Sequence, residues 1–216
     1  SGANVLEGQL VGLVFAANDS SYFVDLAKLA SPQIQDVFKL FLRKDVLLVG
    51  HDLKQLVKAL SLQGVGVVNR LFDAMIASYV LNSSTRAHDL YSIALRELGI
   101  ELPGSAKQSS LFGLDPAVAA RELAVVRQAY EIYRKQLEGE VDRGLFDKIE
   151  MALIPVLADM ELNGVAIDTD VLKKLSVEAL QTVEVLTQKI WKEAGEEFNI
   201  ASPVQLRDIL YEKMGL

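Results

Sequence analysis

Short apolar runs alternate with amphipathic segments in the first 81 residues, and this alternation limits the folds open to the chain more than any other feature. Four apolar runs predict strands, at residues 9–16, 22–24, 46–49 and 65–68. Three segments with helical spacing predict helices, at residues 31–42, 53–62 and 73–81. The order strand, strand, helix, strand, helix, strand, helix is typical of an α/β domain with a mixed sheet and flanking helices.

The strand signal ends near residue 88, and the rest of the sequence is helical. Three pairs of a capping residue and a proline predict helix starts, at Ser31-Pro32, Asp115-Pro116 and Ser202-Pro203. Asn163-Gly164 predicts a helix end, and residues 102–114, which contain Gly, Ser and Pro, predict a loop. This change in content predicts two domains, residues 1–142 and 143–216.

A long helix is predicted from Asp168 to Ala194. Its apolar residues form a stripe with charged residues outside it, which favours a helix packed in a core over one that binds a partner. Trp191 is expected in that core.

Composition indicates an ordinary globular protein. Half of the 216 residues are hydrophobic, and there is no cysteine for disulfides or thiolate metal sites. No targeting signal or membrane-spanning run is visible, so we expect a cytoplasmic protein without a membrane partner. The net charge of −7 argues against autonomous DNA binding, because duplex affinity depends on basic side chains that neutralise phosphates.

Two late segments, Ala158-Asp-Met-Glu-Leu-Asn-Gly-Val-Ala-Ile-Asp168 and Phe198-Asn-Ile-Ala-Ser-Pro-Val-Gln-Leu206, resemble the start of the polymerase domain of family A DNA polymerases, the bacterial DNA polymerase I type. Earlier segments, Leu10-Val-Gly-Leu-Val-Phe-Ala16, Val49-Gly-His-Asp-Leu-Lys54 and Leu71 to Asn82, resemble the 3′–5′ exonuclease domain of the same enzymes. The resemblance implies a ribonuclease H-like (DnaQ-like) domain, followed by an all-α segment that leads into the polymerase thumb.

The resemblance also implies where exonuclease chemistry would lie. Two divalent metals held by four carboxylates activate a water and stabilise the leaving oxygen in such enzymes. The family's Asp-x-Glu pair would fall before Ser1, and its second-motif Asp position holds Leu56. The positions of the third-motif Tyr and Asp hold Ala124 and Gln128. We therefore expect a catalytically inactive exonuclease-like domain that binds no metal.

Two aspartates are weak residual candidates for metal ligands. Asp52 precedes the helix from Leu53, and Asp73 lies between a strand and a helix, so both are interpreted as helix N-caps.

Three hypotheses follow. In the first, the chain is a scaffold fragment of a DNA-directed DNA polymerase that acts in replication and repair, with DNA and the remainder of the polymerase as partners and Mg²⁺ as cofactor of the parent enzyme only. In the second, Asp52, Asp73 and Asp89 are shifted ligands of an active exonuclease. In the third, a non-enzymatic module binds single-stranded DNA or a partner, with Lys54, Lys58 and Arg86 as phosphate contacts.

The resemblance has one consequence for the sheet. The family's first strand is central and would precede Ser1, so its absence would leave two rows of unpaired backbone groups. We expect that strand to come from a companion polypeptide or from a longer parent chain.

Overall fold

The computed structural model describes residues 10–17, 20–102, 115–138 and 140–216. The chain divides into two compact units between Gly164 and Val165. No helix of the described ranges is both long enough and apolar enough to cross a bilayer.

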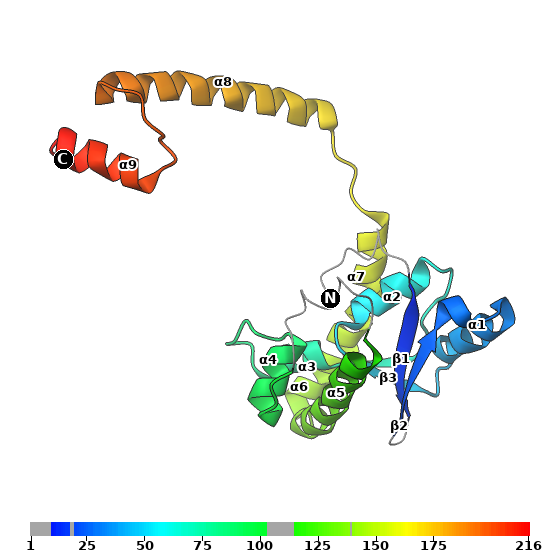
Figure 1. Ribbon diagram of the computed structural model, residues 1–216. Helices are drawn as coiled ribbons and strands as arrows, with labels where there is room; N and C mark the ends of the chain where they lie inside the picture. Colours follow the sequence, from blue (N-terminus) through cyan, green and yellow to red (C-terminus); the bar gives the residue numbers. More distant parts are fainter. Residues whose placement is uncertain (1–9, 18–19, 103–114, 139) are drawn as a thin grey trace. The chain divides into compact units, whose positions relative to one another are not determined.

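The described residues of the first unit form four strands and a set of helices (Figure 1). The strands are β1 (Gly12–Ala17), β2 (Ser20–Asp25), β3 (Leu47–Gly50) and β4 (Arg70–Asp73). The helices of its first half are η1 (Leu26–Lys28), α1 (Ser31–Phe38), η2 (Lys39–Leu42), α2 (Leu53–Ser61) and α3 (Ala74–Leu81). The later helices are α4 (Leu90–Ile93), η3 (Ala94–Leu98), α5 (Pro116–Gln136), α6 (Glu140–Leu145), η4 (Phe146–Glu150) and α7 (Met151–Asn163).

The described strands form two ladders. β1 and β2 make an antiparallel hairpin in which Leu13 faces Val24, and β3 runs parallel to β4 with Val49 opposite Phe72. The α/β class with flanking helices is thereby confirmed. The strand expected before Ser1 stays a prediction.

The last strand lies later in the chain than its apolar run predicted. Residues 65–68 are irregular, and β4 begins at Arg70. Val65 and Val67 pack instead against the small apolar cluster around Phe41 and Leu60. Val65 and Val67 are half-buried and Val68 is exposed, so this run covers a cluster with alternate side chains and forms no ladder.

Local capping signals placed most helix starts correctly. The side chain of Asp115 accepts the Ala117 amide at 2.8 Å, and Ser202 Oγ accepts the Gln205 amide at 3.4 Å. At α1 the expected cap is one residue off, because Ser31 is the first helical residue and Ala30 precedes it. The predicted loop at 102–114 lies, except for its first residue, outside the described residues.

The apolar core of the first unit reaches well past residue 142. Phe146, Met151, Ile154 and Ala158 are buried in the cluster that contains Leu53 and other residues of α2, β4 and α3. The compact unit therefore ends at Gly164, whose φ of 66° ends α7. The domain boundary between residues 142 and 143 stays a prediction. The compact units of the structure divide later in the chain, after Gly164.

The second unit contains α8 (Thr169–Ala194), α9 (Pro203–Arg207) and η5 (Asp208–Lys213). The long helix is where the sequence predicted it, and Asp168 caps it by accepting the amides of Asp170 and Val171. Within this unit no residue of α8 is buried, contrary to the expected core packing. One short helix and one helical turn are too small to cover a stripe of 26 residues. Trp191 is half-buried, and its Nε1 donates to the Phe198 carbonyl at 2.8 Å.

Candidate functional site

Asp73 lies where β4 ends and α3 begins, and its carboxylate is the centre of the candidate site. The residue is fully buried, with an exposed fraction of 0%. Oδ1 accepts the backbone amides of Met75 at 2.9 Å and Asp52 at 3.1 Å, and Oδ2 accepts the amide of Leu53 at 2.6 Å. A single side chain thus caps both α3 and α2, because each helix leaves its first amides without an intrahelical partner.

The electrostatics of Asp73 reflect two opposing effects. Burial raises the pKa of its carboxyl, and the three amide hydrogen bonds act in the other direction. Both oxygens are occupied by backbone donors. Asp73 is consequently a cap shared by two helices, and three of the roughly four acceptor positions of its carboxylate are taken by backbone amides.

Asp52 precedes α2 as predicted, but its side chain does not cap the helix. Its backbone is left-handed, with φ of 53°, which costs energy for a residue that has a Cβ atom. The cap interpretation therefore needs correction. The distant carboxylate of Asp73 takes the amide of Leu53, which leaves the half-buried Asp52 without that role.

The left-handed backbone of Asp52 should determine how substitutions at this position change the stability of the chain. We expect the free energy of unfolding of Asp52→Gly to be about 1 kcal/mol higher than that of Asp52→Ala, because glycine adopts positive φ without a Cβ clash. Urea titration measures the difference. The same pair of changes at Asp36, inside α1, should give the opposite order, because glycine destabilises a helix interior relative to alanine. Equal stabilities of the two variants at position 52 would contradict the role assigned to its backbone.

The other positions compared with the exonuclease motifs carry no carboxylate. Leu56 is half-buried and packs against both apolar clusters of the first unit. Ala124 and Gln128 are exposed on α5, where Gln128 Nε2 donates to the Ala124 carbonyl at 3.4 Å. The residues at these positions do not fit a two-metal centre, which needs several carboxylate oxygens.

The described part of the chain contains no group of three or more His, Cys, Asp or Glu side chains that could hold a metal ion. Asp89, proposed as a shifted ligand, is engaged at the start of α4. Its two carboxylate oxygens accept from the backbone amide of Ser92 at 3.0 Å and from the Ser92 hydroxyl at 2.6 Å. Of the three aspartates in the shifted-ligand hypothesis, Asp73 and Asp89 therefore cap helices with their carboxylates.

The predicted phosphate contacts fall into two groups. Lys54 and Lys58 lie one turn apart on α2, and each donates to one oxygen of Glu161 on α7, at 2.6 and 2.7 Å. Arg86 is exposed in the segment between α3 and α4. Contact of these three residues with DNA stays a prediction.

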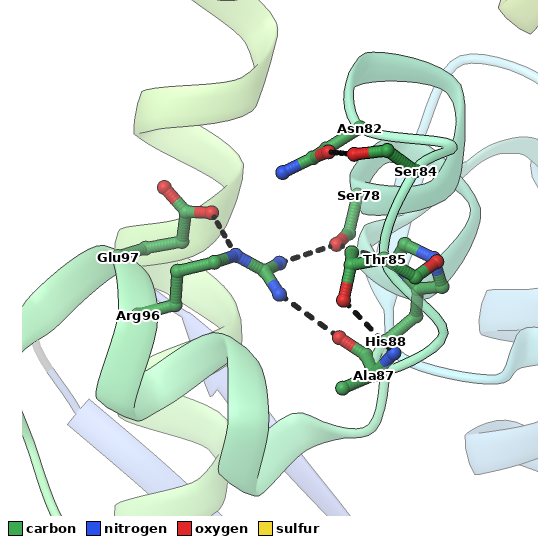
Figure 2. Close-up of polar contacts among 8 residues, drawn as sticks. All are labelled: Ser78, Asn82, Ser84, Thr85, Ala87, His88, Arg96 and Glu97. Carbon is green, nitrogen blue, oxygen red and sulfur yellow. Dashed lines mark hydrogen bonds and ion pairs between the residues drawn. The ribbon is translucent and has the colours of Figure 1, made fainter.

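A polar network that sequence patterns did not reveal joins α3 to the turn before α4 (Figure 2). His88 Nε2 lies 3.0 Å from the Thr85 carbonyl, which can only accept, so Nε2 carries the proton. His88 Nδ1 then accepts from the buried Ser78 hydroxyl at 2.9 Å, and Ser78 Oγ accepts from Arg96 at 2.7 Å. Each of these contacts joins a donor to an acceptor, and Arg96 also donates to the Ala87 carbonyl at 2.9 Å, which is the arrangement of a structural network.

His51 is a second feature that the sequence did not reveal. Its Nδ1 atom is buried and has no hydrogen-bond partner among the described residues, and burial lowers the pKa of the imidazole to about 4. The residue lies between the end of β3 and the left-handed Asp52, so the same backbone turn positions both side chains.

Comparison with known proteins agrees with this geometry. The family model of the DNA polymerase I ribonuclease H-like domain matches residues 1–101. DNA polymerase I of Rhizobium leguminosarum is 36% identical over 185 residues, covering 80% of this chain and 18% of that protein. DNA polymerase I of Bacillus subtilis (strain 168) is 30% identical over 227 residues, covering 100% of this chain and 25% of that protein.

A solved structure extends the likeness to the fold. The POL domain of Pol1 from M. smegmatis, in complex with DNA primer-template and dNTP, matches 95% of this chain and 35% of its own, with a TM-score of 0.77 at 20% identity. Fold and sequence together define a ribonuclease H-like domain of the exonuclease type, continued by helices. The chain belongs to the family A DNA polymerases, the DNA polymerase I group, and spans about a quarter or less of the length of the curated relatives named above.

Proposed function

We propose that this chain is a scaffold part of a DNA-directed DNA polymerase that acts in replication and repair. In this proposal the exonuclease-like domain has lost its hydrolytic site, and Mg²⁺ and DNA are bound through other parts of the parent enzyme. The observation that carries the proposal is the commitment of Asp73 to three backbone amides, together with Leu56 at the second-motif ligand position.

The chemistry of phosphodiester hydrolysis supports this reading. Metal-assisted cleavage needs ligand oxygens that stay available to hard cations. Asp73 and Asp89 both use their oxygens to cap helices, and the positions of the third motif hold Ala124 and Gln128. Asp52 is the one motif-related aspartate among those discussed whose side chain caps no helix. A single carboxylate cannot hold two divalent ions.

The scaffold role is supported by the packing of α7. Its residues Met151, Ile154 and Ala158 lie in the same core as α2 and β4, so the helix is fixed to the exonuclease-like fold before the chain passes Gly164. In the proposed enzyme this core anchors the start of the polymerase domain.

A digestion assay tests the proposal. The full chain is incubated with a single strand labelled at its 5′ end and with Mg²⁺ or Mn²⁺, and we expect no shortening from the 3′ end above the level of a metal-free control. Metal-dependent 3′–5′ degradation by the chain, abolished by Asp52→Ala but retained in Asp115→Ala, would overturn the proposal. Asp115 is the matched control because it is an aspartate that caps α5.

A further inference from the structure

Two lysines of α2 share one carboxylate of α7. Lys54 Nζ lies 2.6 Å from Glu161 Oε1, and Lys58 Nζ lies 2.7 Å from Glu161 Oε2. The lysines are four residues apart, so they project from the same face of the helix. The carboxylate therefore bridges two ammonium groups with one oxygen each, as two oxygens of a phosphate group can do.

Burial differs sharply among the three side chains. The side chain of Lys58 is only 9% exposed and that of Lys54 29%, whereas that of Glu161 is 42% exposed. A buried ammonium needs a counter-ion, because removing it from water unpaired is costly. Here two positive charges meet a single negative one. The two hydrogen bonds to these lysines lower the pKa of Glu161, so the bridging group stays ionised.

Glu161 lies at a position from which it can move away from the two lysines. It is in the last turn of α7, two residues before the end of the helix at Asn163. Helix ends open more readily than helix centres, and opening this turn leaves the buried face at Ile154 and Ala158 in place. The two lysines, by contrast, are held on a helix that is packed into the core through Leu53 and Val57.

We propose that Lys54 and Lys58 form a binding site for one phosphate group, and that Glu161 occupies and masks this site in the free chain. The site goes beyond the scaffold role and does not depend on it, because no metal and no hydrolysis are involved. A free or terminal phosphate, with close to two negative charges, matches the two ammonium groups better than one carboxylate does, and a phosphodiester can offer each of them one non-bridging oxygen. The unmodified chain consequently binds phosphate weakly.

Glu161→Gln tests this proposal by removing the competing charge and nearly keeping the shape. Affinity is measured by calorimetry on the full chain at constant ionic strength, with inorganic phosphate in one arm and an unphosphorylated thymidine oligomer in the other. We expect the variant to bind at least one probe about tenfold more tightly than the unmodified chain. A gain for phosphate alone identifies a free or terminal phosphate as the ligand, and a gain for both identifies the phosphodiester backbone.

Two controls distinguish binding at the two lysines from a general effect of net charge on affinity. Glu131→Gln changes the net charge equally but removes only the exposed ion pair with Arg134, so it should leave both affinities unchanged. Adding Lys58→Met to Glu161→Gln should abolish the gain.

The proposal is overturned if folded Glu161→Gln binds neither probe more tightly, or if Glu131→Gln gains as much. If circular dichroism shows that Glu161→Gln is unfolded, Glu161→Asp takes its place, since the shorter carboxylate reaches only one ammonium. Affinity for at least one probe should then rise about threefold, and an unchanged affinity refutes the proposal that Glu161 masks the site.

Discussion

Asp73→Ala is expected to lower the free energy of unfolding of the first unit by about 3 to 5 kcal/mol, a large effect for one side chain. The change leaves three backbone amides without their acceptor, the buried amide of Leu53 and the part-buried amides of Asp52 and Met75. It also opens a cavity at a position that is fully buried. The effect should appear in urea titration followed by circular dichroism. Fluorescence of the single tryptophan, Trp191, reports on the second unit instead.

Two comparisons identify the cause of that loss. Asp73→Asn keeps the shape of the side chain and one carbonyl oxygen, so its free energy of unfolding should fall less than that of Asp73→Ala. Asp115→Ala removes a cap that accepts one amide, and a cost of about 1 kcal/mol is expected. Hydrogen exchange offers a local check, because the amides of Leu53 and Met75 should lose protection together in Asp73→Ala. If Asp73→Ala costs no more than Asp115→Ala, Asp73 does not join the two helices as described.

The chain is expected to lose up to about 3 kcal/mol of stability as the pH falls from about 6.5 to about 4, because of His51. Burial lowers the pKa of His51 to about 4 in the folded state, below the ordinary value of 6.5. Between these values the unfolded chain binds the proton and the folded chain does not. Stability therefore rises with pH across this range and is lost as the pH falls.

The variants His51→Gln and His88→Gln separate this effect from other titrations. His51→Gln should flatten the pH dependence between 4 and 6.5, measured as the urea midpoint at each pH. His88→Gln replaces the other of the two histidines as the matched comparison, and the effect of His51 is the part of the slope that only His51→Gln removes. Burial raises the pKa of Asp73, which favours the folded state at low pH and has the opposite sign. That contribution is common to both variants and cancels in the comparison. A slope unchanged in His51→Gln would contradict the burial of a neutral imidazole.

Elements governed by neighbouring residues could be predicted from the sequence. Asp115-Pro116 and Asp168 mark helix starts because a cap and its amide are two or three residues apart. The hairpin of β1 and β2 was predictable for the same reason, since its strands are close in the sequence. The family resemblance of Ala158 to Asp168 is likewise carried by a short segment and is confirmed by the comparisons.

Features that depend on distant residues could not be predicted. The cap of α2 comes from Asp73, 20 residues beyond Leu53, so local preference assigned it wrongly to Asp52. Lys54 and Lys58 looked like free cations in the sequence, but Glu161 lies 107 and 103 residues away from them. An apolar run such as 65–68 does not state whether its side chains form a strand or pack against a cluster, and here only Val65 and Val67 pack against one.

Calorimetric titration of the full chain with Mn²⁺ tests the central claim most directly, namely that the exonuclease-like domain has no metal centre. Mn²⁺ prefers the same oxygen ligands as Mg²⁺ and reports a carboxylate site through heat of binding. We predict no saturable heat at millimolar metal, and the same trace from Asp52→Ala as from the unmodified chain. Saturable binding of two ions per chain that disappears in Asp52→Ala and persists in Asp115→Ala would contradict the account.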